Sequence, residues 1–364
     1  MADTRQATGL TPEQWDDQFY EEYIQESPFK GLMGTSENSI IQMTENFKKG
    51  KGDAFTVALV NRLTGSAVTG TNVLEGNEQD MASRSFRFTV DKRRTAVRIA
   101  EMSEYRSSIN LRDAARSTLM TWAQEDVRDR IIDALGSING TAYASATEAQ
   151  KDAWLVDNTD RVLFGALVSN HGVDHSAALA NIDNTDDKLT PGALSLMKRI
   201  ALATRSSNKP KIRPIRVAGQ NRRYFKVMCG PRTFRDLKTN TTITQAQREV
   251  SVEMENNRLF QGGDLLWDGM IIHEVDDIGV LSGVGAGGID VEPVYLCGAQ
   301  AIAYGSARRY ATKTKTFDYG DKYGVAIECI DGIHKMRFGT GSDDTDDTVD
   351  HGVVTGFFAA VADS

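Results

Sequence analysis

Apolar residues recur at steps of mostly three and four along residues 111–135, a spacing that predicts one long amphipathic helix. The apolar positions are Leu111, Ala115, Leu119, Trp122, Val127, Ile131 and Leu135. Ser108 or Asn110 can cap the start of this helix, and Gly136 can end it. At about 1.5 Å per residue, such a helix forms a rod of roughly 40 Å. A second, shorter helix is predicted over Pro191–Arg205.

Two segments with strand composition precede the long helix. Ala54–Arg62 and Ser85–Ile99 are rich in β-branched and aromatic residues, and apolar and polar positions alternate in the second segment. We predict that they pair as a hairpin whose tip, residues 63–84, is rich in Gly, Thr, Asn and Glu. A loop of this length is usually functional. Because an isolated hairpin is only marginally stable in water, we expect this one to lie on another surface.

The C-terminal half predicts strands mixed with short helices. The strand candidates are Tyr224–Cys229, Leu265–Val275, Val294–Gly305 and Tyr323–Phe338. Pro231–Thr239 is expected to form a helix that begins on its proline. Residues 138–189 are polar and show no clear period.

Residues 1–45 combine an amphipathic pattern with strong acidity. Trp15, Phe19 and Tyr23 recur at helical spacing, so a helix there needs a surface to cover. The segment holds nine acidic and two basic side chains, a net charge of −7. Acidic leading segments commonly act as interaction tails. We therefore expect this segment to contact its own chain or a neighbouring copy.

Charge is distributed unevenly along the rest of the chain. The totals are 42 basic and 50 acidic side chains, a net charge of −8, which argues against a dedicated nucleic-acid-binding protein. Residues 46–100 nevertheless hold ten basic and five acidic side chains. The last 26 residues hold six aspartates and no lysine or arginine, so we expect residues 339–364 to form a solvated acidic tail.

The cysteines indicate a reduced protein without a disulfide framework. Cys229, Cys297 and Cys329 are odd in number and far apart, which excludes a CxxC metal pattern and favours buried thiols. The first residues lack an apolar segment, so we expect no secretory signal. The longest apolar stretch, near Val353–Ala362, is too short to span a bilayer.

Two motifs resemble cofactor or metal sites but lack the required context. Gly283, Gly285 and Gly288 have a dinucleotide-type spacing, yet a strand-like segment follows where the fingerprint requires a helix, so we expect a turn between strands. His171 and His175 are four residues apart, but no third ligand is indicated, and we expect histidines of a surface loop.

No other motif in the sequence carries recognisable chemistry. The acidic run at residues 343–351 lacks the central glycine and closing glutamate of a calcium loop. The chain also contains no GxSxG elbow and no cysteine beside a histidine. We therefore expect no catalytic, cofactor-binding or metal-binding residues, no cofactor and no enzymatic activity.

The strongest concentration of charge is basic and lies in the second hairpin segment. Lys92, Arg93 and Arg94 are consecutive, and Arg84, Arg87 and Arg98 are close in sequence. This cluster is either a solvated strand face or a docking surface for acidic protein or phosphate. Because acidic and basic segments adjoin, contacts between copies are as plausible as contacts with DNA.

Four stretches carry a family resemblance. VLEGNEQ at residues 73–79 combines a glycine with acidic residues in the long loop, and FKVMCGPRTFRDLKTN at residues 225–240 combines a strand, a proline and a short helix. GGDLLWDGMIIHEVDDI at residues 262–278 and VYLCGAQAIAYG at residues 294–305 have strand composition. Taken in order, they resemble the loop tip, the segment of strand, proline and short helix, and the next strands of the major capsid proteins of tailed bacteriophages with the Hong Kong 97-type fold, in the family without a cleaved prodomain.

This resemblance implies an α+β fold with a defined order of parts. The expected parts are an N-terminal arm (1–46), an extended β-hairpin loop (47–100), a peripheral domain with a long spine helix (101–212), an axial domain (213–307), returning strands of the peripheral domain (308–338) and the acidic C-terminal tail (339–364).

The implied function is structural. Such a subunit self-assembles into hexamers and pentamers that form the icosahedral head of the virion around double-stranded DNA, and it assembles in the host bacterial cytoplasm. The expected partners are other copies of the chain, portal protein and scaffolding or decoration proteins, with non-specific contact to DNA and none to a membrane. The alternatives are an encapsulin-like shell protein and, from the glycine motif alone, a nucleotide-binding oxidoreductase. The residues expected at subunit contacts are Trp15, Phe19, Tyr23, Val73, Leu74, Glu75, Arg84, Arg87, Lys92, Arg93 and Arg94.

Overall fold

The helix predicted from the apolar spacing is present as α3, Leu111–Gly136, in a computed structural model of the chain. Asn110 caps it, because its side chain accepts hydrogen bonds from the backbone N–H groups of Arg112 and Asp113. Most of the expected apolar stripe is buried, including Leu119 and Ile131. The structure describes residues 29–45, 54–60, 67–70, 72–78, 83–107, 110–203, 211–216, 222–243, 245, 265–341 and 343–362.

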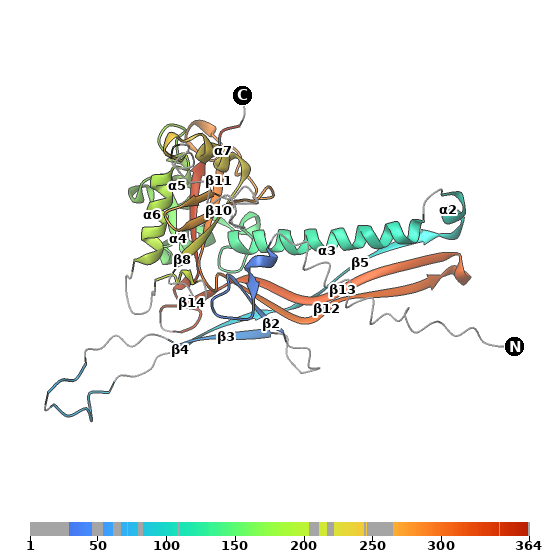
Figure 1. Cartoon of the computed structure of the whole chain (residues 1–364), viewed down its shortest axis with the longest axis horizontal. Coiled ribbons are helices and arrows are strands. Elements are labelled where there is room, and N and C mark those ends of the chain that lie inside the picture. The colour runs from blue at the N-terminus through green and yellow to red at the C-terminus, as the bar shows by residue number, and fades with distance from the viewer. Residues whose placement is uncertain are drawn as a thin grey trace.

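α3 covers one face of a five-stranded sheet. The order across this sheet is β1 (Met33–Gly34), β2 (Ile41–Glu45), β12 (Ile302–Phe317), β13 (Lys322–Lys335) and β5 (Asp91–Ala100). β13 pairs antiparallel with both β12 and β5, whereas β2 pairs parallel with β12. Figure 1 shows α3 and the three long strands running side by side toward α2, Glu101–Arg106. We call this part, α3 with β5, β12 and β13, the projection.

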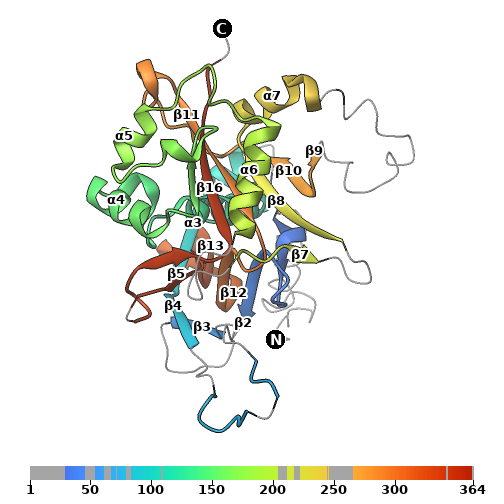
Figure 2. The ribbon, with the colours of Figure 1, turned by 90° about the vertical axis from the view of Figure 1, so that its left-hand side faces the viewer.

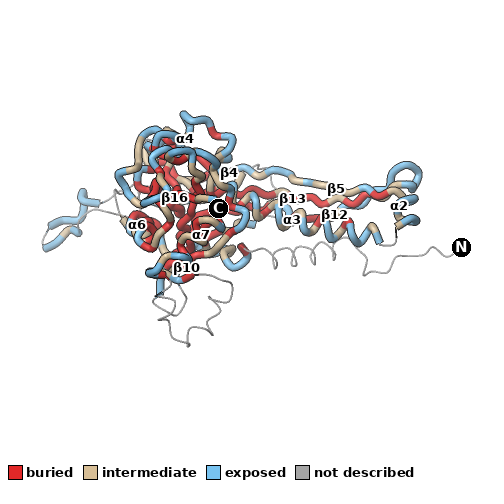
Figure 3. The backbone as a smooth tube through the Cα atoms, turned by 90° about the horizontal axis from the view of Figure 1, so that it is seen from above, coloured by how far each residue is buried: buried red, intermediate tan, exposed pale blue. Residues whose placement is uncertain are grey.

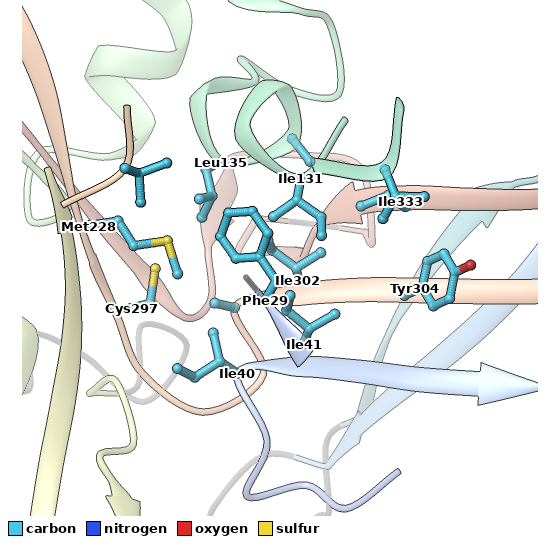
Figure 4. Close-up of a cluster of buried hydrophobic side chains, with 14 of the residues drawn as sticks. Phe29, Ile40, Ile41, Ile131, Leu135, Met228, Cys297, Ile302, Tyr304 and Ile333 are labelled. Carbon is cyan, nitrogen blue, oxygen red and sulfur yellow. The ribbon is translucent and has the colours of Figure 1, made fainter. Parts of the chain in front are cut away.

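Buried positions recur along the backbone of the projection (Figure 3), and Val127 of α3 packs in one cluster with Val325 and Ile327 of β13. At its base, Ile131 and Leu135 of α3 pack with Phe29, Ile41 and Ile302 (Figure 4). Met228 and Cys297, which belong to a second sheet, join the same cluster. Each fully buried side chain of this size contributes about 1.5–3 kcal/mol. The two sheets therefore share one hydrophobic core at their junction.

The second sheet has seven strands and helices on both faces (Figure 2). Its order is β6 (Val162–Phe164), β16 (Val353–Ala359), β11 (Val291–Cys297), β8 (Arg223–Cys229), β10 (Met270–Glu274) and β9 (Leu265–Trp267), with β7 (Ile215–Arg216) paired to β8. α6 (Pro191–Leu202) and α7 (Pro231–Thr239) pack on one face. α4 (Glu148–Asp157) and α5 (His175–Ala180) pack on the other.

The predicted helices and most predicted strands are confirmed, with changes at turns. α6 ends at Leu202, three residues earlier than expected, and α7 has the expected bounds. The strand expected over Leu265–Val275 is the hairpin of β9 and β10, because Asp268 and Gly269 turn the chain at φ 46° and 70°. Gln300, at φ 57°, similarly divides the strand expected over Val294–Gly305 into β11 and β12.

The predicted hairpin is only partly right. β3 (Ala54–Val60) pairs antiparallel with β4 (Ser83–Thr89), but the second segment then continues as β5, which leaves the hairpin and pairs with β13. The basic run Lys92–Arg94 therefore belongs to the projection. Pairing with β13, which is distant in sequence, takes β5 out of the hairpin. The alternation of apolar and polar residues within a segment does not specify which strand that segment pairs with.

Two expectations about the ends of domains are wrong in the structure. The last residues are not a solvated tail, because β16 lies inside the seven-stranded sheet and all seven of its residues are buried. α4, α5 and α6, expected in one part of the chain with α3 (residues 101–212), pack on the seven-stranded sheet together with strands from residues 213–307. In both cases apolar side chains are buried on a sheet whose other strands lie far away in the sequence. This burial, and not the polar composition of the neighbouring residues, determines where the elements pack.

The remaining elements are short. β14 (Arg337–Gly339) pairs with β15 (Thr348–Asp350). The described 3-10 turns are η2 (Lys30–Leu32), η3 (Tyr143–Ser145), η4 (Val168–Asn170), η7 (Ala286–Gly288) and η8 (Asp318–Gly320). All three cysteines are free and buried, as expected. Among the described helices, none has the length and apolarity needed to cross a membrane.

Candidate subunit interface

The tip of the long loop, residues 72–78, exposes two adjacent apolar side chains. The backbone N–H of Asn77 donates to Leu74 O, and its side-chain amide donates to Val73 O, both at 2.9 Å. Gly76 has φ 86°, a conformation that favours glycine. On this turn Val73 is 66% exposed and Leu74 64% exposed. Figure 1 places the tip away from both sheets, beyond β3 and β4.

The base of the loop rests on the chain's own surface. Phe55, Phe86 and Phe88 pack with Phe338, with ring centroids of neighbouring pairs 5.7–6.3 Å apart. Gly305 of β12 provides the space, since a Cβ there would lie 2.7 Å from the ring of Phe55. The expectation that this hairpin needs a supporting surface is confirmed for β3 and β4.

Polar contacts hold β4 to Gly341 and to Asp344 of the acidic run. Arg84 Nη2 donates to Gly341 O at 2.7 Å. The Ser85 hydroxyl and backbone N–H donate to the Asp344 carboxylate at 2.6 and 3.1 Å, and these hydrogen bonds lower the pKa of Asp344. Asp344 of the acidic run thus binds the base of the loop. The side chain of Arg87, which is also on β4, is exposed.

The three consecutive basic residues point to opposite faces of the projection. Arg93 faces α3 and forms an ion pair with Asp126 at 2.5 Å. Lys92 and Arg94 lie on the outer face of the sheet and are exposed, as is Arg98. Among the described residues Arg94 and Arg98 have no ion-pair partner. Arg93 therefore stabilises the subunit itself, while its neighbours are available to a second molecule.

One buried carboxylate organises this outer face. Glu328 of β13 pairs with Lys92 at 3.0 Å and with Arg308 at 2.7 Å, and it also contacts Lys313. The hydrogen bond from Lys313 is the largest cause that lowers the pKa of Glu328 to about 2, and Lys92 and Arg308 add to it. The face carries Lys315 as well, so its cations outnumber its single acid.

The structure groups only some of the residues expected at subunit contacts. Val73, Leu74 and Glu75 are together at the loop tip and exposed. Trp15, Phe19 and Tyr23 lie outside the described residues. Arg98, which the sequence places in the basic cluster, lies on the same exposed face. Lys313 and Lys315 also join this face but were missed, because β12 and β5 meet only through β13. The two-residue spacing of Lys92, Arg94 and Arg98 was the available sequence signal.

The glycine-rich motif has the predicted conformation, whereas His175 of the histidine pair does not lie where the sequence predicts. The glycine-rich segment is a turn between β10 and β11, with Gly283 at φ 68°, as expected. The surface position expected for His175 is wrong: this side chain is 1% exposed and packs against Phe164 and Phe357. Burial lowers the pKa of His175 to about 4, and the charge of Lys151 contributes.

Among the described residues, one group of acidic side chains could hold a metal ion. Glu148, Asp152 and Asp174 place carboxylate oxygens within 4.8 Å of one another, at the start of α4 and just before α5. This group lies in the segment that shows no clear sequence period, and only the packing of α4 beside α5 brings it together.

Comparisons with known proteins agree with this architecture. The model of the family described as phage capsid protein matches residues 6–361. The major capsid protein of Pseudomonas phage KPP25 is 29% identical over 96% of both chains. The capsid structure of cyanophage Pam1 is 31% identical with a TM-score of 0.81 and full coverage of both chains. That of Ralstonia phage GP4 shares the fold at 21% identity and a TM-score of 0.72, over 100% of this chain and 96% of the other.

These findings confirm the α+β fold and the resemblance seen in the sequence, and they support neither the encapsulin-like nor the oxidoreductase alternative. The chain belongs to the phage capsid protein family and is a major capsid protein, a self-associating subunit of the virion shell.

Proposed function

We propose that this chain assembles into hexamers and pentamers, which form an icosahedral head of the Hong Kong 97 type around double-stranded DNA. The family match over residues 6–361 is the observation that carries the proposal. An apolar loop tip on one copy that covers a different surface on the next makes a heterologous contact, and such contacts close into rings when the rotation permits. Capsomers are rings of this kind.

The loop tip is the proposed contact with the neighbouring subunit. Val73 and Leu74 gain hydrophobic stabilisation only if another molecule covers them, since no other described residue of their own chain does so. Glu75 adds a charge that suits a basic surface. The exposed basic face of the projection, with Arg94 and Arg98, is the complementary charge pattern on the same subunit.

We assign the parts as the sequence suggests, with the bounds adjusted to the structure. Residues 1–28 act as an arm on neighbouring copies, and residues 47–89 form the extended loop. The end of the arm predicted from the sequence, residue 46, is too late, because Phe29 lies in the core of the subunit and β1 and β2 belong to its own five-stranded sheet. The projection and its sheet form the peripheral domain, and the seven-stranded sheet with its helices forms the axial domain. The subunit has a structural role and no catalytic one. Portal protein and scaffolding or decoration proteins are the further partners, DNA contact is non-specific, and assembly takes place in the host cytoplasm.

The proposal is tested by the variant V73D/L74D. Both side chains are exposed in the subunit, so the change should leave its thermal unfolding temperature unaltered. Electron microscopy and sedimentation should then show free subunits in place of shells, because the contact would lose both apolar side chains and would have to desolvate two added carboxylates.

The matched control is V156D/L167D, which adds the same charge at two exposed apolar positions on α4 and before η4. We expect this control to form shells. Shells of normal yield from V73D/L74D would contradict the role of the loop tip. A wild-type chain that stays monomeric under all assembly conditions would contradict the proposed shell itself.

A further inference from the structure

Two histidines pack against the rings that anchor the base of the extended loop. We call these rings the aromatic cluster: Phe55, Phe86, Phe88 and Phe338. His334 of β13 lies beside Phe88, with ring centroids 5.5 Å apart. The ring of His351, which follows β15, has its centroid 5.0 Å from that of Phe338. Both imidazoles therefore belong to the packing that holds β3 and β4 on the subunit.

The docked position of the loop depends on this packing. β3 and β4 pair with each other, and a two-stranded hairpin alone is only marginally stable in water. Phe86 and Phe88 are 6% and 4% exposed, so the cluster is the apolar anchor of β4. The hydrogen bonds of Ser85 with Asp344 add to it, but they are exposed to solvent. We therefore expect a weakened cluster to let the hairpin move away from the sheet.

Charges on three other elements face His334. Burial is the largest cause that lowers the pKa of His334. A hydrogen bond with the Thr89 backbone opposes this shift, and so does the charge of Asp91 on β5. Arg337 of β14 and Arg130 of α3 add to it. The net effect keeps this imidazole neutral at pH 7.

Two cations face His351. Burial lowers the pKa of His351 from its ordinary 6.5 to about 4, and the charges of Arg213 and Arg161 lower it as well. The carboxylate of the preceding residue, Asp350, pairs with Lys335 at 2.7 Å. A proton on either imidazole thus places a new charge among apolar rings and beside arginines.

We propose that His334 and His351 form an acid-sensitive latch, which holds the base of the extended loop at neutral pH and releases it when they are protonated. The neutral rings complete the aromatic cluster. The charged rings gain water only when the cluster opens, so protonation favours the released loop. The latch is a property of a single chain, whereas its effect on contacts between subunits rests on the proposed function of the loop tip.

The direction of the pH effect follows from the two states of the loop. The docked loop holds the pKa of His351 at about 4, and release returns this pKa toward 6.5. The stabilisation by the neutral ring is therefore complete above pH 6.5 and is lost as the pH falls toward 4. At pH 5 this difference alone favours the released loop about 30-fold. Asp344 is still ionised at pH 5, because its pKa is lowered from 3.8, so its hydrogen bonds to Ser85 do not change.

The test is hydrogen exchange on the full-length unassembled subunit, expressed as protection factors that correct for the intrinsic effect of pH on exchange. Amides of β3 and β4 should lose protection by about tenfold or more between pH 7 and pH 5, while those of β16 keep theirs. H334Q/H351Q does not titrate in this range, and glutamine can still donate a hydrogen bond to the Thr89 backbone. Loop protection in this variant should be the same at both pH values.

The matched control is H171Q/H273Q, which replaces two half-buried histidines that lie before α5 and on β10. It should lose loop protection as the wild type does. An undiminished loss in H334Q/H351Q, no loss in the wild type, or an equal loss in β16 would each overturn the proposal. A second measurement needs no variant: NMR titration of the wild type should show that loop protection falls as His334 and His351 are protonated, and protonation without that fall would overturn the latch.

Discussion

Replacement of Arg130 by methionine tests how the long helix is held on the sheet of the projection. Arg130 of α3 donates two hydrogen bonds of 2.8 Å to Asp331 of β13, and its Nε lies 3.0 Å from Asp126. Burial by itself would lower the pKa of Arg130, but the hydrogen bonds and charge of Asp331 outweigh it and raise this pKa further. The Asp331 side chain is only 1% exposed.

The variant R130M leaves the Asp331 carboxylate buried and without its cation. Asp331 then keeps only the Tyr304 hydroxyl at 3.3 Å and the weak Cys329 thiol contact at 3.6 Å. Removal of one member of a buried ion pair costs about 3–5 kcal/mol, because the other charge stays in the low-dielectric interior. We expect R130M to lower the free energy of unfolding by about that amount.

The double variant R130M/D331N isolates the cause. If the buried charge is responsible, neutralising it should recover about 0.5–3 kcal/mol of the loss, the usual range for directly coupled residues. The assay is urea unfolding of the unassembled subunit, followed by circular dichroism. R128M on the same helix is the control, since Arg128 pairs with Asp129 and Asp277, both partly exposed, and should cost at most about 1 kcal/mol. A cost for R130M no larger than that of R128M, or no recovery in the double variant, would refute the reasoning.

Two further predictions concern the basic face of the projection. The folded pKa of Glu328 is about 2, below its ordinary 4.5, so its ionised form stabilises the fold above pH 4.5, and this contribution is lost as the pH falls toward 2. Thermal unfolding of wild type and E328Q should therefore differ at pH 6 and converge near pH 2, and a difference independent of pH would contradict the assignment. R94Q/R98Q removes two charges that have no ion-pair partner among the described residues, without placing a second carboxylate opposite Glu328, so it should unfold like the wild type yet lose shells in electron micrographs. R93E, which places an anion beside Asp126, should itself be less stable. Normal shells from R94Q/R98Q would exclude this face as a subunit contact.

The helices could be predicted from the sequence because the signals that specify them lie within a few neighbouring residues. α3 and α7 follow from apolar spacing, a cap and a proline, all within a few residues of the helix itself. β16 could not be placed this way, because its partners β6 and β11 are distant in sequence and an acidic stretch precedes it. The proposed subunit contact shows the same division. Val73 and Leu74 are adjacent in one loop, so the sequence alone indicates them, but the basic face depends on three strands that meet only in the folded sheet.

The place of β16 also determines what a partly folded subunit exposes. Val353–Ala359 lie between β6 and β11 inside the seven-stranded sheet, although both partners are distant from them in sequence. Until β16 docks, β6 lacks its strand partner and the edge of β11 stays open. Because these contacts join distant segments, the sheet pays the entropy of closing long loops before it closes. A subunit caught before this step presents two open strand edges, which another chain could pair with in place of β16.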